Sequence, residues 1–339
     1  MATTLKIIPP GHAALPGPSG QPGSSRGKPT RRRSPRFSLH HAVCSYGYFI
    51  LAPNRWDVER RVLHRPLRTP DGRLLHTTLR QARDGTLRLA CDRAVPRAHH
   101  AGLRRQVARM LRFDEDFGPW RRLHPGARKR GFDRMFRSPT LFEDLVKTIT
   151  SCNVTWRNTI AMNRLMVEHV GGGGFPSPEQ LADFGEQRLK ESCRVGYRAD
   201  RIVRLARRVA DGELDLADFE DPGRDSDAVY ADFLAIHGLG PYAAANLCHL
   251  VARYDKLAID TETYRHFCHH YDVDRPKSSD AAGLKRLHHH IEQHYGRYAP
   301  FQFLAYWFEL WEDYQARFGP AWGWDRETTG TQFTAAVLK

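Results

Sequence analysis

The stretch of sequence that decides the fold spans residues 233–248 and consists of Phe233-Leu234-Ala235-Ile236-His237-Gly238-Leu239-Gly240-Pro241-Tyr242-Ala243-Ala244-Ala245-Asn246-Leu247-Cys248. Its apolar start continues a helical pattern over residues 228–236, and Pro241 suits the first position of a second, alanine-rich helix. Between the helices, Gly238 and Gly240 permit a tight turn because glycine has no Cβ atom. The backbone N–H groups of such a turn remain uncovered at the helix start and attract an anion. The stretch therefore predicts a helical hairpin that binds phosphate.

Glycine-rich turns also bind dinucleotides, and the context of this turn excludes that alternative. A dinucleotide-binding fold needs a strand before its glycines and a third glycine at a fixed spacing. Here the preceding residues have a helical pattern, and no third glycine follows at that spacing. The hairpin interpretation is therefore preferred.

The charge of the chain indicates a polyanionic partner. It has 339 residues, with 52 Lys and Arg against 38 Asp and Glu, so its formal net charge is +14. A membrane surface would match this charge, but the sequence has neither a run of ~18 apolar residues nor a basic amphipathic helix. We therefore expect nucleic acid, and not a membrane, as the partner.

The pattern along the chain predicts an α+β protein, in which a small N-terminal antiparallel sheet domain precedes a predominantly α-helical body. Residues 1–35 are rich in Pro, Gly and Ser and include Arg31-Arg32-Arg33, which is typical of a disordered basic tail. Residues 36–115 form the expected sheet domain, 116–325 the helical domain, and 326–339 a C-terminal tail. The expected strands cover residues 42–51, 61–68, 74–79 and 86–91, which are separated by turn signals.

Helix starts and cysteine spacing add two further expectations. Ser138 before Pro139 predicts a helix N-terminus, and Ser177 with Gln180 predicts a second one that has a capping box. The six cysteines lie far apart without a CxxC pair, which is typical of reduced thiols. Because no secretion signal is evident, we expect a cytoplasmic protein, associated with the nucleoid if its source is bacterial.

The hairpin resembles that of the helix-hairpin-helix DNA glycosylase superfamily, which is typified by endonuclease III, 8-oxoguanine glycosylase and 3-methyladenine glycosylase II. The resemblance covers roughly residues 138–270 and, more loosely, the sheet before them. Members carry an essential aspartate about twenty residues after the hairpin glycines, and Asp260 stands twenty positions after Gly240. The resemblance therefore implies a base-excision repair enzyme that flips a damaged base out of duplex DNA and uses Asp260 as its catalytic carboxylate.

The chemistry of base excision explains why a carboxylate is needed at this place. Cleavage of the N-glycosidic bond builds positive charge on the deoxyribose, and a fixed carboxylate can stabilise that charge and orient a water molecule. The alternative role of Asp260 is structural, because aspartate is common as the N-cap of a helix.

The resemblance also implies a set of residues that bind DNA. In the hairpin these residues are Gly238, Leu239, Gly240 and Tyr242. Asn153, at the end of the first family helix, would enter the gap left by the flipped base. Arg198 belongs to the run Gly196-Tyr197-Arg198-Ala199, which is similar to a run that opens a helix in the 8-oxoguanine branch. The alternative is that neither residue binds DNA: Asn153 would then belong to an ordinary polar loop and Arg198 to an ordinary helix start.

Tyr242 stands where members with lyase activity carry a lysine that forms a Schiff base. We therefore expect a monofunctional glycosylase, with Lys256 as the nearest displaced amine for the lyase alternative. An aromatic residue here is similar to the 3-methyladenine branch, and Tyr242 could line a substrate pocket for alkylated bases or simply pack in the core. The Gly-Tyr-Arg-Ala run points instead to oxidised purines.

We expect no cofactor. An iron–sulfur cluster is excluded by ligand count, since only Cys268 follows Asp260. His266, Cys268, His269 and His270 lack the HExxH arrangement of a zinc site, so no metal is expected. The resemblance implies a monovalent cation on backbone carbonyls of residues 236–238. We expect a monomer, and the alternative from a different class is a non-catalytic DNA-binding module.

Overall fold

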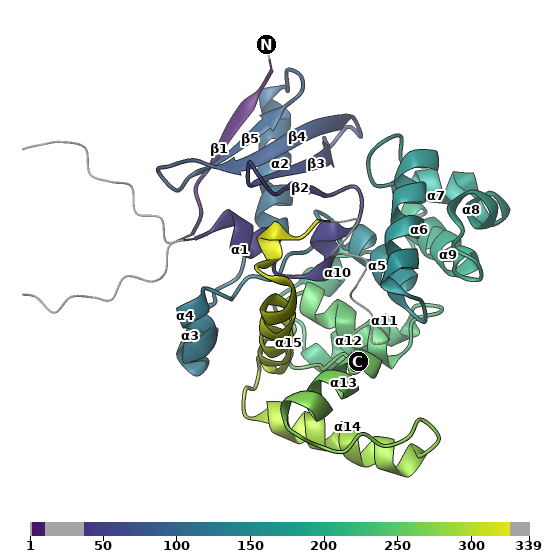
Figure 1. Cartoon of the computed structure of the whole chain (residues 1–339). Coiled ribbons are helices and arrows are strands. Elements are labelled where there is room, and N and C mark those ends of the chain that lie inside the picture. Colours follow the sequence, from purple (N-terminus) through teal and green to yellow (C-terminus); the bar gives the residue numbers. More distant parts are fainter. Residues whose placement is uncertain (1, 11–36, 326–339) are drawn as a thin grey trace, which may run out of the picture.

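The computed structural model describes residues 2–10 and 37–325, and its N-terminal part is a five-stranded antiparallel sheet (Figure 1). The strand order is β1-β5-β4-β3-β2. Along β5, inward residues such as Leu87 and Leu89 are buried and those between them are exposed, so one face of the sheet covers a core. The strands are β1 Thr4–Ile7, β2 Arg55–Asp57, β3 Val62–Arg68, β4 Leu74–Gln81 and β5 Leu87–Cys91.

The prediction that residues 1–35 form a tail is wrong for β1. Thr4–Ile7 pairs with β5, and Leu5 and Ile7 are buried on the inner face of the sheet. This alternation of two apolar residues is too short to stand out in the sequence, and it needs a partner strand more than eighty residues away. The rest of the predicted tail, residues 11–35, and the predicted tail 326–339 lie outside the described residues.

The strand predicted for residues 42–51 is also wrong. This segment forms the helix α1 Leu39–Val43 and the short 3-10 helix η1 Gly47–Ile50. Tyr48, Phe49 and Ile50 are 2%, 1% and 3% exposed, whereas a half-buried strand would expose every second residue. Burial on all sides therefore overrides the strand preference of these aromatic and β-branched residues. The three other predicted strands are confirmed as β3, β4 and β5.

The rest of the described chain is predominantly helical, as predicted, so the α+β fold class is confirmed (Figure 1). None of the helices in the described part combines the length and apolar composition needed to cross a membrane. The helices are α2 Arg97–Met110, α3 Gly118–Leu123, α4 Pro125–Arg130, α5 Leu141–Ser151, α6 Trp156–His169, α7 Pro178–Phe184, α8 Glu186–Cys193, α9 Arg198–Ala210, α10 Ala217–Glu220, α11 Ser226–Ala235, α12 Pro241–Leu250, α13 Thr261–His270, α14 Ala281–Gly296 and α15 Gln302–Phe318, with the 3-10 helix η2 Ala321–Gly323.

Two helix starts test the capping predictions. The capping box at Ser177 is confirmed, because its hydroxyl accepts from the Gln180 N–H and the Gln180 side chain accepts from the Ser177 N–H. The start predicted at Ser138 is wrong: α5 begins at Leu141, after the N-cap Thr140. The Ser138 N–H instead donates to the carboxylate of Asp144, at 2.9 Å.

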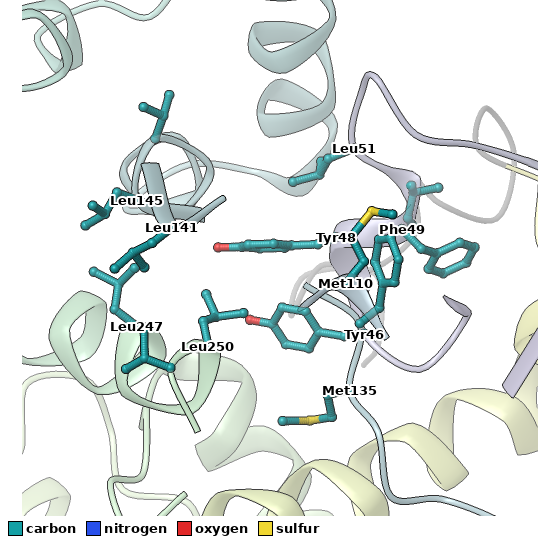
Figure 2. Close-up of a cluster of buried hydrophobic side chains, with 14 of the residues drawn as sticks. Tyr46, Tyr48, Phe49, Leu51, Met110, Met135, Leu141, Leu145, Leu247 and Leu250 are labelled. Atoms are coloured by element: carbon teal, nitrogen blue, oxygen red, sulfur yellow. The ribbon is translucent and has the colours of Figure 1, made fainter. Parts of the chain in front are cut away.

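One continuous hydrophobic cluster, from Leu5 to Trp324, joins the sheet to the helical body. Figure 2 shows Tyr46 and Tyr48 pointing from the η1 segment towards leucines of α5 and α12. The indole of Trp307 in α15 donates to the backbone carbonyl of Ser45 at 2.8 Å. The predicted regions 36–115 and 116–325 thus share a core, and the boundary between them stays a prediction.

A buried ion cluster ties β3 to α5. The Arg65 guanidinium makes a bidentate contact with Glu143, and Lys147 Nζ lies 2.6 Å from the same carboxylate. Their side chains are 3%, 2% and 0% exposed. Burial raises the pKa of Glu143, but the two cations outweigh this effect and lower that pKa to about 2. A single carboxylate therefore compensates two buried positive charges.

Replacing this carboxylate is expected to destabilise the fold strongly. Glu143→Gln leaves Arg65 and Lys147 buried without a counter-charge, which costs roughly 3–5 kcal/mol of unfolding free energy. The matched control Glu168→Gln breaks the exposed pair of Arg164 and Glu168 and costs about 0–1 kcal/mol. Urea unfolding followed by circular dichroism measures both, and equal losses would contradict the role given to Glu143.

Candidate active site at Asp260

The predicted hairpin is confirmed as the turn between α11 and α12. Gly238 has φ +83°, a conformation that favours glycine, and the Leu239 side chain is buried below the turn. Gly240 is the N-cap of α12, and a Cβ atom there would meet open space. Its N–H makes no hydrogen bond within the described residues. The first turn of α12 therefore presents free donors to solvent.

The hairpin packs on the start of α9. A Cβ atom on Gly238 would lie 2.3 Å from Cδ of Arg201, so the absence of a side chain lets Arg201 cross the turn. His237 Nε2 lies 3.0 Å from the carboxylate of Asp200 on the same helix. The contact between His237 and Asp200 and the close approach of Arg201 to Gly238 thus hold the hairpin against α9.

Asp260 stands at the start of α13, as predicted, and its carboxyl is fixed by that helix. Oδ1 accepts from the N–H groups of Glu262 and Thr263, both at 2.9 Å, and the Asp260 N–H donates to Oγ1 of Thr263 at 3.1 Å. This is a capping box, so the structural role of Asp260 is confirmed. Oδ2 accepts no hydrogen bond from any described residue. One carboxylate oxygen is therefore held and the other remains available.

The carboxyl of Asp260 is half-buried, and three tyrosines lie near it. Burial raises the pKa of Asp260 above its ordinary value, although hydrogen bonds from Thr263 oppose this. Burial likewise raises the pKa of Tyr242, Tyr46 and Tyr306, and each of these phenols is close enough to Asp260 for its charge to add to the shift. The structure thus brings Tyr242 of the hairpin into the neighbourhood of Asp260, together with tyrosines from two other parts of the chain.

Tyr46 is a member of this group that sequence reasoning missed, because residues 42–51 were interpreted as a strand. Its hydroxyl donates to Oδ1 of Asn246 at 2.8 Å and lies 3.2 Å from Nε2 of His249. Asn246 in turn donates to Oγ1 of Thr148 at 3.2 Å. These hydrogen bonds hold the N-terminal segment against α12, beside the candidate site. In the sequence, the only sign of this contact is the polar residue Asn246 in the apolar helix after the hairpin glycines.

Asn153 lies in the turn between α5 and α6, where it is exposed and has φ +50°. The Arg198 guanidinium donates to the carbonyls of Cys152 and Asn153, the latter at 3.1 Å, and its side chain is buried. Arg198 thus positions the Asn153 turn, and this geometry does not support the direct DNA contact predicted for Arg198. Asp260 and the guanidiniums of Arg198 and Arg201 all influence the Cys152 thiol, which places this turn close to the carboxyl.

Tyr197 is a second residue that the sequence analysis passed over. It is 51% exposed, and its ring lies 4.6 Å from the Arg198 guanidinium and 4.8 Å from that of Arg201. A large exposed ring between two cations suits stacking on a nucleobase next to a phosphate. The run Gly196-Tyr197-Arg198-Ala199 was its only signal, and the prediction chose the arginine.

The described histidine-rich set in α13 does not bring together three potential metal ligands. Within residues 2–10 and 37–325, no three His, Cys, Asp or Glu side chains lie in an arrangement that could hold a metal ion. His266 is buried, its ring stacks at 5.3 Å on that of His270, and burial lowers its pKa to about 3. His266 is therefore a neutral core residue.

Comparisons with known proteins agree with this architecture. No protein-family model matches the chain, and no curated protein matches its sequence. Among solved structures, the 3-methyladenine DNA glycosylase from Archaeoglobus fulgidus is similar, with TM-score 0.59 and 16% identity, over 83% of this chain and 96% of that one. The apo 8-oxoguanine glycosylase/lyase from Clostridium acetobutylicum has TM-score 0.52 and 17% identity, over 78% and 93%. Its complex with double-stranded DNA containing cytosine opposite 8-oxoG gives 0.52 and 16%, over 79% and 92%. The chain therefore has the fold of the 3-methyladenine and 8-oxoguanine DNA glycosylases.

Proposed function

We propose that this chain is a monofunctional DNA glycosylase of base excision repair, which hydrolyses the N-glycosidic bond of a damaged base with Asp260 as the catalytic carboxylate. The observation that carries the proposal is the placement of Asp260. Its carboxyl is fixed through Oδ1, keeps Oδ2 available, and lies beside Tyr242 of a hairpin whose N–H groups are free. The fold shared with DNA glycosylases supports this interpretation.

Binding of duplex DNA begins at the hairpin. The free N–H groups of Gly240 and of the first turn of α12 attract a phosphate, and the helix dipole favours its negative charge. The exposed Asn153 and Tyr197 lie on the turn and helix that Arg198 joins, where they can occupy the gap left by an extruded nucleotide. Extrusion costs least for a damaged or mispaired base, which contributes to selectivity.

Bond cleavage then depends on the charge of Asp260. As the base leaves, positive charge develops on the sugar, and the ionised carboxylate stabilises it while Oδ2 orients a water molecule. The tyrosines Tyr46, Tyr242 and Tyr306 reduce the access of solvent, which strengthens this interaction. Their electron-rich rings favour a cationic, alkylated base over a neutral one, with oxidised purines as the alternative substrate class.

The environment of the nearest lysine supports a monofunctional enzyme. Tyr242 occupies the lysine position, and the Lys256 Nζ contacts the carboxylates of Asp227 and Asp255, the latter at 3.0 Å. Burial lowers the pKa of Lys256, but the two carboxylates outweigh this effect and raise that pKa above its ordinary value. A Schiff base needs a neutral amine, so Lys256 is poorly suited to this role.

The hairpin backbone fits the monovalent cation that the family resemblance implies. The carbonyl oxygens of His237 and Gly238 accept no hydrogen bond within the described residues, while that of Ile236 accepts from Leu239 at 3.1 Å. The two free carbonyls would hold the ion, which would supply positive charge beside the bound phosphate. The glycines and the buried Leu239 fix this turn.

A non-catalytic DNA-binding module is the competing function, and Asp260→Asn separates the two. The amide preserves the shape and one capping oxygen but removes the negative charge. We expect duplexes with single alkylated, oxidised or deaminated bases to bind within about threefold of wild type, and base release from the substrate to fall by ~10²–10⁴. Because the product is an abasic site, strand breaks should appear only after alkali. Unchanged base release in the variant would refute the catalytic role.

The pH dependence of base release follows from the raised pKa of Asp260. As pH falls through this pKa, the carboxylate becomes neutral and cannot stabilise the sugar cation, so single-turnover rates should decline. The midpoint is expected above the ordinary aspartate range. Spontaneous depurination without enzyme is subtracted, and the residual rate of Asp260→Asn serves as the control that lacks this step. A midpoint at or below the ordinary range would contradict the described environment.

A charge at the hairpin N-cap tests the phosphate contact. Asp and Asn are both good N-caps and a side chain at Gly240 has open space, so neither Gly240→Asp nor Gly240→Asn should destabilise the protein. The aspartate would repel the phosphate, and we expect duplex affinity about tenfold lower for Gly240→Asp than for Gly240→Asn. Fluorescence anisotropy measures both. Equal affinities would place the phosphate elsewhere.

A further inference from the structure

One cavity of the described residues lies apart from the Asp260 site. Its volume is about 1620 Å³, and neither Asp260 nor any of the tyrosines beside it lines the wall. It is lined by two turns of the sheet, by α1, by the segments around Phe113 and Phe132, and by the end of α15 with η2. This cavity is therefore a second candidate site, independent of base excision.

Four arginines of the sheet border this cavity: Arg60 and Arg61 in the β2–β3 turn, and Arg80 and Arg83 at the end of β4 and just after it. The pairing of Leu63 with Leu79 places the start of β3 next to the end of β4, so the two pairs lie at the same end of the sheet. All four side chains are exposed. The described residues provide none of them with an ion pair or a side-chain hydrogen bond.

The acidic residues of the cavity do not neutralise this group. Asp133 and Glu312 pair with Arg121 and Arg130, and Asp114 pairs with Arg137. Asp84 lies 3.8 Å from Lys6, and Glu115 pairs with Arg112. Among the lining acids only Asp116 has no ion pair, so four unpaired cations face one unpaired anion. This excess of positive charge suits a ligand with several phosphates.

Aromatic side chains also line this cavity. His41 stacks on Trp322 with a centroid distance of 4.8 Å, and His40 meets Trp322 edge-on at 4.7 Å. Burial, with smaller contributions from His41 and Arg61, lowers the pKa of His40 to about 4, and burial also lowers the pKa of His41. These rings therefore add uncharged π surface close to Arg61. Phosphate-binding cations beside half-buried rings are the features that proteins use to bind single-stranded nucleic acid.

We propose that this cavity binds an unpaired DNA strand, with the four arginines of the sheet on the phosphates and the rings of His40, His41 and Trp322 against a base. The site goes beyond the proposed glycosylase function, because it shares no residue with the Asp260 cluster. A strand bound here is held by the same molecule that acts on duplex DNA at the hairpin.

The test compares two double variants of equal charge change. Arg80→Glu with Arg83→Glu reverses two cavity cations, whereas Arg104→Glu with Arg105→Glu reverses two exposed arginines of α2 that do not line the cavity. Anisotropy of a labelled oligothymidylate is measured across a salt series. The cavity variant should bind at least about tenfold more weakly and lose about 0.7 of the salt slope for each lost phosphate contact. The α2 variant should stay within about twofold of wild type.

Three further measurements identify the site and the ligand. The cavity variant should keep wild-type single-turnover base release, and Asp260→Asn should keep oligothymidylate binding, so failure of either proposal is distinguishable. Inorganic tripolyphosphate should compete much less well than unlabelled oligothymidylate, because it lacks bases for the aromatic side chains. Equal weakening in both double variants, or equal competition by tripolyphosphate, would overturn the proposal.

Discussion

The hydrogen bonds between Oδ1 of Asp260 and two backbone N–H groups of α13 are the constraint on which the proposed site depends. They fix the carboxyl at a helix N-terminus, where the helix dipole favours its negative charge, while burial opposes that charge. The cap and the catalytic role are therefore compatible. The cap accounts for one oxygen and for the orientation of the side chain, and the other oxygen remains available for chemistry.

The N-terminal part of the chain completes the surroundings of this carboxyl. Tyr46 reaches α12 through Asn246, and the indoles of Trp307 and Trp311 in α15 donate to the carbonyls of Ser45 and Cys44. These contacts join three parts of the chain that are far apart in sequence. The segment between α1 and η1 thus places a tyrosine in the candidate site, and two turns of the sheet border a separate cavity that is rich in arginine.

Local sequence signals predicted the elements that form locally. The hairpin glycines, Pro241 and the spacing to Asp260 depend on turn and cap chemistry within a few residues, and these features are found where they were expected. The region 42–51 was misinterpreted because Tyr48, Phe49 and Ile50 favour a strand in isolation but are buried on all sides by distant helices. The positioning role of Arg198 was equally hidden, since its partners are carbonyls about forty-five residues away.

The most direct test of the central claim is a crystal structure of the Asp260→Asn protein with a duplex that carries its substrate base. The account predicts a phosphate on the N–H groups of the hairpin and an extruded nucleotide, with the side chain of residue 260 roughly 3–3.5 Å from the C1′ atom or from a water molecule in line with it. A nucleotide that remains stacked in the duplex, or a C1′ atom far from residue 260 while the hairpin is bound, would contradict the assignment of this carboxylate.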